Sequence, residues 1–323
     1  MTKVKEKFVA HIKAGDRVDD IFVLAEKRLG HKRDGDAFLN VTLTDRSGRI
    51  KGVVWDNALQ IAAAADAGQF VRAGGAVGQY RGALQLVVQQ LIAVPAKSVA
   101  PEDFLPSTSR DVPRMFERLK ALTDTIACDN LRALINAFWN DAEVVRKFKR
   151  APAAKMIHHA YVGGLLEHTL SMALLVDKIA DHYTDVDRDL LLVGVVLHDI
   201  GKLRELCYHH SLDYTDEGRL LSHIALGLEM VQAKIDGLDS FPQDRAALIK
   251  HMIVSHHGTR EFGSPEPPKT IEAVLLNYID EIDSRMNAIR AFMADQDPNA
   301  SWTAYHRLFE RHFYKGSAAP SGA

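Results

Sequence analysis

Short stretches of alternating hydrophobic and polar residues mark the first third of the chain, between residues 17 and 94. Leu39, Val41 and Leu43 form one apolar series, and Ile50 and Val54 belong to a second. A period of two with one apolar face is typical of half-buried strands. The pattern predicts strands over residues 17–25, 37–45, 49–56, 70–80 and 83–94, with a short helix over 57–67 after the third. This order matches a small Greek-key barrel of the OB type.

Two aromatic residues, Phe38 and Trp55, have the parity of the polar positions and are expected on the outer face of this barrel. Basic residues flank them along the sequence. Such a face suits base stacking and phosphate contact with a single-stranded nucleic acid. The alternative is that both rings pack against the second domain. The candidate nucleic-acid-binding residues of the barrel are Lys32, Arg33, Phe38, Arg49, Lys51, Trp55, Arg72 and Arg81.

The period changes to helical beyond residue 114, after a proline-containing stretch over residues 95–113. Helices are expected over residues 115–127, 131–149, 163–183, 187–207, 222–235, 242–255, 271–294 and 301–314, with no strand. The predicted class is therefore multidomain α+β, a small β-barrel followed by an all-α bundle. The expected divisions are an N-terminal segment (1–16), the barrel (17–94), a linker (95–113), the helical domain (114–315) and a flexible tail (316–323).

Composition narrows the class of protein further. The chain has 323 residues, 47% hydrophobic and 25% charged, which is ordinary for a globular protein. Its N-terminus lacks the apolar core of a secretory signal, and it has no run of about 18 apolar residues that would predict a membrane span. Cys128 and Cys207 are far apart and outside any CxxC motif, so we expect reduced thiols and a cytoplasmic location.

The chemistry is concentrated in the helical part. Metal-competent side chains occur as single residues and as two adjacent pairs: His168, His198-Asp199, His223, His256-His257 and Asp280. Neutral imidazole and carboxylate ligate Mn, Fe, Zn or Ni. An aspartate beside a histidine can bridge two ions, and water between them becomes hydroxide at neutral pH. The set therefore predicts a phosphoester hydrolase.

A lone histidine on an apolar helix face, such as His168, is more often a hydrogen-bonded core residue than a ligand. The pairs change that balance, because His198 and Asp199 end a strongly apolar run where two ionisable groups are costly unless satisfied. Lys202 follows and is interpreted as a phosphate contact, with a solvated lysine or a salt-bridge partner as the alternatives. Histidines in polar or loop-like surroundings, or without a carboxylate nearby in the sequence, are set aside as ligands: His158, His159, His182, His209, His210, His251 and His306. Glu281 and Asp283 are expected on a solvated face, with hydrogen bonding to the metal ligands as the alternative.

The series His168, His198-Asp199 and Asp280 resembles the signature of the HD-domain metal phosphohydrolases, over residues 155–286. With the barrel, HDIGK and HHGTREFGSPEPPKTIEAVLLNYIDEID, nearly the whole chain is similar to the YhaM-type 3′–5′ exoribonucleases. The resemblance implies an all-α catalytic domain, Mn²⁺, and shortening of single-stranded RNA, sometimes DNA, from the 3′ end. One departure is Asn277-Tyr278-Ile279, where the family often has a His-x-Ala-type run.

The expected mechanism assigns His168, His198, Asp199 and Asp280 to a first ion. His223, His256 and His257 hold a second, with Asp199 bridging. The hydroxide between the ions attacks the terminal phosphodiester, and Lys202 and Arg260 contact phosphate. Asp199 and Lys202 are the candidate catalytic residues. Two divalent ions are expected, Mn before Fe, Ni, Zn or Mg.

Three alternatives remain open at this point. The helical domain could hydrolyse a small nucleotide while the barrel regulates it. The protein could bind nucleic acid without turnover and hold a structural metal. It could also be an oligomeric scaffold, since apolar helices such as residues 274–289 could form interfaces. Single-stranded RNA, single-stranded DNA and further copies of the chain are the expected partners.

Overall fold

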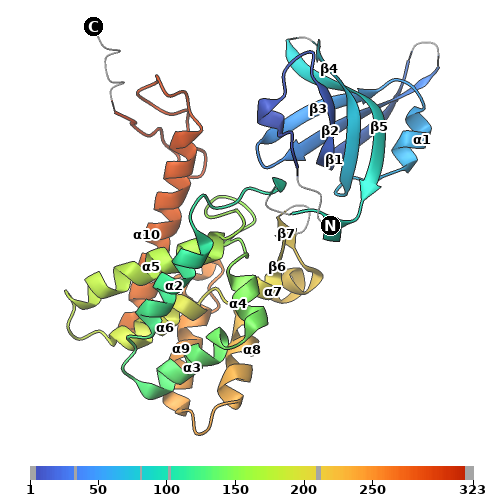
Figure 1. Cartoon of the computed structure of the whole chain (residues 1–323). Coiled ribbons are helices and arrows are strands. Elements are labelled where there is room, and N and C mark those ends of the chain that lie inside the picture. The colour runs from blue at the N-terminus through green and yellow to red at the C-terminus, as the bar shows by residue number, and fades with distance from the viewer. Residues whose placement is uncertain (1–4, 33–34, 81, 101–102, 209–211, 317–323) are drawn as a thin grey trace. The chain divides into compact units, whose positions relative to one another are not determined.

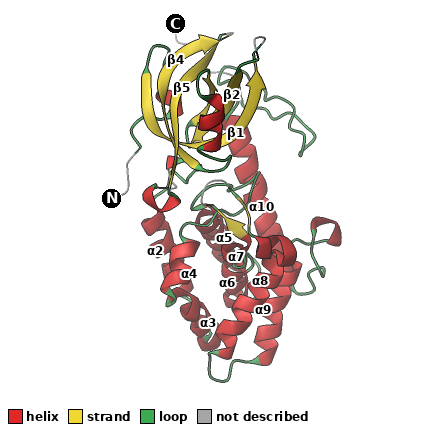
Figure 2. Cartoon of the chain, turned by 90° about the vertical axis from the view of Figure 1, so that its right-hand side faces the viewer, coloured by secondary structure: helices red, strands yellow, loops and turns green. Residues whose placement is uncertain are grey.

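The computed structural model describes residues 5–32, 35–80, 82–100, 103–208 and 212–316. The chain divides into two compact units. The first comprises residues 1–110, 161–163 and 206–216, and the second comprises residues 111–160, 164–205 and 217–323. Strands dominate the first unit and helices the second (Figures 1 and 2).

The first unit is built on a closed five-stranded barrel with strand order β1-β2-β3-β5-β4. All neighbouring strands are antiparallel except β3 and β5, which are parallel. The helix α1 (Ala58–Ala63) follows the third strand, so the predicted OB-type barrel is confirmed. The strands are β1 (Arg17–His31), β2 (Ala37–Asp45), β3 (Gly48–Val54), β4 (Phe70–Tyr80) and β5 (Ala83–Val94).

The period of two is visible in the barrel interior. Leu39, Val41 and Leu43 are buried in one core cluster with Ile50 and residues of the other strands. One position departs from the alternation: Val53, expected on the outer face, is only 2% exposed and pairs with Asn40 and Val87. β1 also runs six residues beyond the predicted end at residue 25, because a bulge between Leu24 and Glu26 lets pairing with β2 continue.

Residues that precede the first strand and residues that follow the last strand in the sequence also pack onto the barrel. Ile12 joins the barrel core just after a short 3₁₀ helix (Val9–His11). Val99 and Phe104, within the stretch expected as a linker, pack with Phe70 in a second small cluster. A further 3₁₀ turn, Ala96–Ser98, leads into this contact.

The second unit is helical, and α6 (Arg188–Leu197) lies at its centre. Every residue of α6 from Leu190 to Leu197 is buried, and the helix contacts α3, α5, α9 and α10. The aspartate Asp187 caps its N-terminus by accepting from Leu190 N at 3.0 Å. The other helices are α2 (Val112–Thr123), α3 (Asp129–Trp139), α4 (Ala142–Phe148), α5 (Gly164–Ala180), α7 (Lys202–Glu205), α8 (Asp216–Asp236), α9 (Gln243–Ser255) and α10 (Ile271–Ala294).

Several predicted helix bounds are wrong. The helix expected over 131–149 is split, because Asp141 caps a new helix by accepting from Glu143 N and Val144 N. The helix expected over 187–207 stops at Leu197, and a two-stranded sheet, β6 (Leu206–Cys207) with β7 (Asp213–Tyr214), forms where no strand was predicted. Residues 209–211, including His209 and His210, lie outside the described residues, as does most of the expected tail.

The helix expected over 301–314 is absent. Isolated bridges instead pair Trp302 with Tyr314 and His306 with Arg311. The ring of His306 packs against Phe309 at 4.8 Å and Phe292 at 4.4 Å between centroids. The apolar residues that suggested a helix are thus satisfied by an aromatic cluster in a folded loop.

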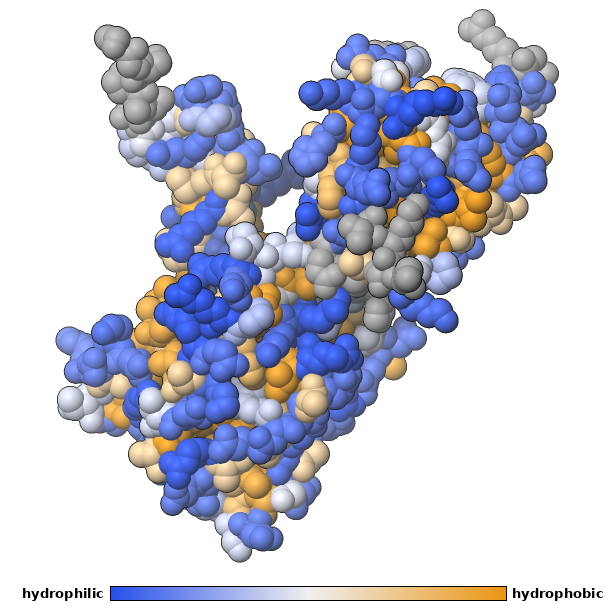
Figure 3. All heavy atoms as spheres, viewed as in Figure 1, coloured by the Kyte–Doolittle hydropathy of each residue, from blue (hydrophilic) through white to orange (hydrophobic). Residues whose placement is uncertain are grey.

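Hydrophilic and hydrophobic side chains are interspersed over the visible face of each unit (Figure 3). Within the described ranges, no helix combines the length and the apolarity needed to cross a membrane.

Truncating Leu43, which is fully buried in the barrel, should destabilise the first unit. We expect Leu43→Ala to lower its free energy of unfolding by about 2–5 kcal/mol, since the cavity cannot be fully refilled. Urea denaturation followed by circular dichroism measures this. Leu59→Ala, at an exposed position of α1, is the control and should change stability by less than about 0.5 kcal/mol.

Candidate metal centre

The seven predicted ligands come from five helices and meet in one place within the helical unit. His168 lies on α5 and Asp280 on α10. His198 and Asp199 directly follow α6, and His256 and His257 directly follow α9. His223 lies within α8. The buried helix α6 therefore delivers an ionisable pair from the middle of the unit.

One group of ligand atoms gathers around one oxygen of Asp199. His198 Nε2 lies 3.3 Å and His168 Nε2 lies 3.9 Å from Asp199 Oδ2. His168 Nε2 is also 3.3 Å from Asp280 Oδ1. The ligand atoms of His168, His198 and Asp280 all lie within 4.8 Å of one another, close enough to share an ion.

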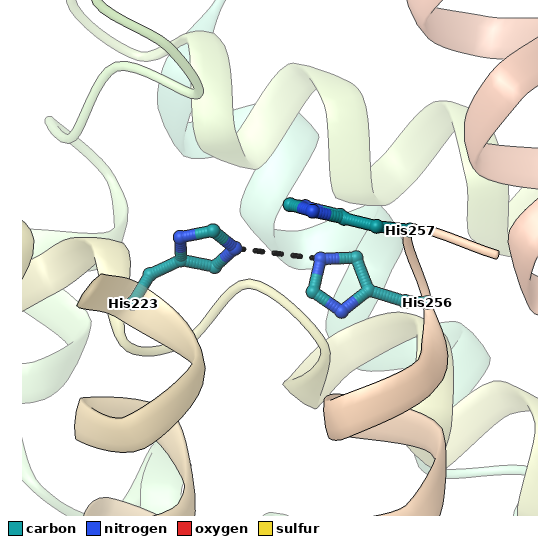
Figure 4. Close-up of side chains that lie close together, drawn as sticks. All are labelled: His223, His256 and His257. Carbon is teal, nitrogen blue, oxygen red and sulfur yellow. Dashed lines mark hydrogen bonds between the residues drawn. The ribbon is translucent and has the colours of Figure 1, made fainter. Parts of the chain in front are cut away.

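A second group lies on the other oxygen of Asp199. His223 Nε2 is 3.6 Å and His256 Nε2 is 3.8 Å from Asp199 Oδ1. Figure 4 shows His223 and His256 pointing toward each other, with their Nε2 atoms 3.4 Å apart, and His257 beside them. These three histidines also place ligand atoms within 4.8 Å of one another. Asp199 therefore presents one oxygen to each group.

The Nδ1 atom of each of these histidines is already bonded to an oxygen. An imidazole that donates from Nδ1 to a carbonyl or carboxylate keeps the Nε2 lone pair free for a metal. The acceptors are Asp283 for His168, Val195 O for His198, Glu205 for His223, Ile253 O for His256 and Phe262 O for His257, at 2.7–3.1 Å.

The site also contains buried polar atoms for which the described residues provide no hydrogen-bond partner. Four buried side-chain polar atoms in the described part of the chain lack a hydrogen-bond partner, and three belong to this site: His168 Nε2, His198 Nε2 and Asp199 Oδ1. Leaving such groups unpaired in a protein interior costs about 1–3 kcal/mol each. Two imidazole lone pairs and a carboxylate oxygen need a cation rather than another acceptor. The residues present therefore fit divalent ions.

The electrostatics point the same way. Burial alone would lower the pKa of His168, but the carboxylates of Asp280 and Asp283 beside the ring outweigh burial and raise that pKa to about 9. Burial opposes ionisation of Asp199, yet Lys202 and His198 hold the pKa of this carboxyl well below its usual range. When no metal ion is bound, His168 is therefore protonated at pH 7, and its positive charge lies between the carboxylates of Asp280 and Asp283.

His256 and His257 behave differently from His168. Burial lowers the pKa of both imidazoles, and neighbouring histidines lower it further. Both side chains are therefore neutral at pH 7 and ready to act as ligands.

Close backbone packing holds α8 against the His198-Asp199 turn. A Cβ on Gly201 would lie 1.9 Å from His223 O and 2.6 Å from Gly227 N, so only glycine fits. Ser222, directly before His223, has φ 60° and ψ 162°, a strained conformation inside a helix. Glu205 accepts from the backbone N of His223 at 2.8 Å and fixes this break.

Three residues of the site were set aside in the sequence. Asp283, expected on a solvated face, is only 9% exposed and binds His168, His159 and Ser171. His159 was also set aside as a ligand, yet its Nε2 lies 2.8 Å from Asp283. The signal for Asp283 was its spacing: three residues after Asp280, it shares a helix face with that ligand.

His158 is the third. It lines the cavity at the site, and burial, Lys202 and His168 lower the pKa of its imidazole to about 4. It reaches this place through a loop in which Ile157 and His159 both have positive φ. Gly164 permits the loop, since a Cβ there would lie 2.0 Å from His159 O. No local sequence period reveals such a contact.

A cavity of about 490 Å³ opens beside the ligands. Lys202 lines it, and its Nζ lies 2.5 Å from Asp199 Oδ2. The remaining lining residues near the ligands are His158, Gly258, Thr259, Phe262, Asn277, Tyr278, Glu281, Ser284 and Arg285.

The barrel residues predicted to bind nucleic acid are placed as follows. The rings of Phe38 and Trp55 contact each other, 5.6 Å between centroids, and Trp55 is 45% exposed. Lys32 Nζ lies 5.8 Å from the Trp55 ring. Arg49 and Lys51 are exposed on the neighbouring positions of β3, whereas Arg33 and Arg81 lie outside the described residues.

Two other predicted contacts are partly engaged. Arg72, on β4, makes a two-pronged ion pair with Asp19 on β1, at 2.6 and 2.5 Å, so it is less suited to a phosphate than predicted. Arg260, in a 3₁₀ turn (Arg260–Phe262) of the helical unit, is exposed and lies 3.7 Å from Glu266.

Comparison with known proteins gives separate matches for the barrel and for the helical unit. Residues 165–285 match the family model of the HD domain, and residues 23–94 match that of the OB-fold nucleic acid binding domain. The chain thus carries an OB-fold domain and an HD domain. All seven predicted ligands fall within the HD match, which indicates the superfamily of metal-dependent phosphohydrolases. A third model, described as "Putative helicase", matches residues 98–185.

Two solved structures are similar to part of this chain. One is the second OB-fold domain of replication protein A from Methanococcus maripaludis, 16% identical over 27% of this chain and 93% of that chain, with a TM-score of 0.23. The other is the protein PriB from Ralstonia solanacearum, 14% identical over 25% of this chain and 100% of that chain, also with a TM-score of 0.23.

Metal binding should release a proton from His168 near pH 7.5. The raised pKa keeps this imidazole protonated between about pH 6.5 and 9, and an ion must displace the proton. In the chelated protein, this proton contributes stability that is fully present below pH 6.5 and lost as pH rises through about 9. Calorimetric titration with Mn²⁺ in two buffers of different ionisation enthalpy measures the release. Equal enthalpies in both buffers would contradict the assignment.

Adding one methyl group at Gly201 should disrupt the site. We expect Gly201→Ala to weaken Mn²⁺ binding by about tenfold or more, because His223 must shift with α8. Gly237→Ala near the end of α8 is the matched control, since a Cβ there meets only ordinary contacts at 3.5 Å and beyond. Unchanged Mn²⁺ affinity in Gly201→Ala would show that the close packing does not position the ligand.

Proposed function

We propose that this protein is a metal-dependent 3′–5′ exonuclease that hydrolyses terminal phosphodiester bonds of single-stranded RNA. The observation that carries the proposal is the position of Asp199. Its two oxygens face two separate groups of imidazoles, and Oδ1 has no hydrogen-bond partner in the described structure. A carboxylate placed in this way suits the bridging ligand of a two-ion centre.

The first ion would be held by His168, His198, Asp199 and Asp280, and the second by His223, His256 and His257 with Asp199. Divalent ions, Mn²⁺ by preference, would polarise the phosphoryl oxygens and lower the pKa of water. The outer partners Asp283 and Glu205 orient His168 and His223 for this task.

Lys202 supplies the protein's own positive charge. Its ammonium group lines the cavity and contacts Asp199, so it can stabilise the negative charge that builds up on the phosphoryl group. His158 lines the same cavity in its neutral form at pH 7 and can hydrogen-bond to a phosphate ester oxygen or to a ribose hydroxyl.

The barrel supports a polymeric substrate. The exposed Trp55 ring, with Phe38 of β2 against it and Lys32 close by, provides a stacking surface with positive charge, and Lys51 is exposed further along β3. OB folds bind oligonucleotides with this face. The match to the OB-fold nucleic acid binding domain supports this role. The 3′ polarity and the preference for RNA rest on the resemblance to the YhaM-type enzymes.

Replacing Asp199 should abolish turnover but leave strand binding. Asp199→Asn removes the charge shared by both imidazole groups, so we expect hydrolysis of a 5′-labelled single-stranded RNA to fall by at least about a thousandfold. The Kd for the same strand without added metal should stay within about twofold. Labels at either end, a DNA strand and a dNTP tested in parallel report polarity, sugar and size of substrate. Turnover of the dNTP alone would replace the proposal with a small-nucleotide hydrolase.

Removing the Trp55 ring should weaken binding without altering the chemical step. Trp55→Ala is expected to raise the KM for a long strand about tenfold, the typical effect of one lost stacking partner, while kcat stays within about twofold. Ile92→Ala, an exposed apolar position on β5 paired with Arg72 of β4, is the control. Equal KM values for Trp55→Ala and wild type would place the strand elsewhere.

A further inference from the structure

Two large aromatic side chains line the cavity beside the metal ligands and remain exposed. Phe262 is 71% and Tyr278 is 58% exposed, although both line the same hollow as Asp199, His257 and Asp280. Among the described residues, neither ring packs against another aromatic ring. Exposed aromatic rings beside charged groups are a recurring way to bind the flat face of a nucleobase.

We propose that Phe262 and Tyr278 form a stacking site for the base of the terminal nucleotide, next to the bond that is cut. This inference rests on the proposed function and names the subsite that would hold the leaving nucleotide. It differs from the barrel surface around Trp55, which belongs to the other unit of the chain.

The position of Phe262 is fixed by the metal site. His257 Nδ1 donates to Phe262 O at 3.0 Å. The same histidine that is predicted to bind an ion therefore also holds the backbone of Phe262. Ser264, which is buried, closes the loop around the ring, because its Oγ lies within hydrogen-bond distance of two carbonyl oxygens, Val254 O at 2.9 Å and Glu266 O at 2.8 Å, and its one hydrogen can go to either. A ring on an anchored loop loses little conformational entropy when a base stacks on it.

Tyr278 is fixed by its helix. It lies two residues before Asp280 on α10, and Asn277 beside it donates from Nδ2 to His256 O at 2.7 Å. Both rings are therefore tied to segments that carry ligands. A base that stacks on them keeps a constant relation to the reacting phosphate.

The rest of the cavity complements a nucleotide. Its volume of about 490 Å³ lies in the range of pockets for small molecules. Lys202 offers positive charge for phosphate, whereas Arg285 is paired with Glu281. Thr259, Asn277 and Ser284 offer hydroxyl and amide groups for a sugar. Stacking tolerates all four bases, which suits an enzyme that removes nucleotides in turn.

Tyr278 has a second explanation. It belongs to a series of exposed apolar residues on α10 at helical spacing, namely Ile271, Val274, Tyr278, Ile282 and Met286, which could contact another protein surface. Phe262 is not part of α10. A role for Phe262 therefore cannot be explained by an exposed apolar face of α10. For this reason the experiment substitutes Phe262.

The test removes the base and the ring separately. Single-stranded RNA ending in a normal 3′ nucleotide is compared with the same strand ending in a base-free ribose, using full-length wild-type and Phe262→Ala proteins. For the wild type, loss of the base should raise the KM about tenfold. For Phe262→Ala, the two strands should have KM values within about twofold. An equal effect of base removal in both proteins would overturn the inference.

Three variants separate stacking from a structural role. Phe262→Tyr should restore the sensitivity to the base, whereas Phe262→Leu, which is apolar but not aromatic, should not. Tyr183→Ala removes a ring that is 51% exposed but lines a different hollow, and it should behave as wild type. If Phe262→Leu restores the sensitivity fully, ring stacking is not the cause and the inference fails.

A binding measurement keeps the inference separate from turnover. A strand with 2-aminopurine at its 3′ end is mixed with protein in the presence of a chelator, and fluorescence is expected to fall in wild type but not in Phe262→Ala. If the fluorescence of the two proteins differs but neither hydrolyses the strand with any metal, the proposed function is overturned and the stacking site is not. Hydrolysis without any difference would overturn the stacking site alone.

Discussion

The structure of the helical unit depends on an unusual concentration of buried hydrogen-bond acceptors around one carboxylate. Asp199 lies among four histidines whose Nδ1 atoms are already committed to other oxygens. The lone pairs of His168 Nε2 and His198 Nε2 and Asp199 Oδ1 have no donor in the described structure. Acceptors packed together in this way repel one another, and only added positive charge makes the arrangement stable. Lys202 supplies part of that charge, and where no ion is bound a proton on His168 Nε2 takes the place of its lone pair and adds to it.

The surrounding fold is arranged to maintain this concentration. Helix α6 is buried along its length, so its end cannot move away from the neighbouring helices without opening the core. Gly201 lets α8 approach the same turn within van der Waals contact. The strain at Ser222 is kept because Glu205 bonds His223 on both its backbone and its ring. The contacts that pack these helices together are therefore also the contacts that position the metal ligands.

The sequence predicted the parts of this molecule that follow a local period or an unusual local context. The barrel strands follow alternation, and His198-Asp199 stands out because two ionisable groups end an apolar run. The features it missed depend on contacts far apart in the chain. Asp283 is buried only because His159 and His168 approach from other segments. Residues 301–314 have a helical pattern, but their rings pack on Phe292 and on one another instead.

The ligands extend from residue 168 on α5 to residue 280 on α10, and every intervening helix from α6 to α9 takes part in or supports the site. During synthesis, the first ion site cannot be complete until α10 has left the ribosome, whereas the residues proposed for the second ion all precede α10. Filling of both sites would therefore end with a late step. Ions in both places would connect helices that are remote in sequence, much as disulfide bonds do in secreted proteins.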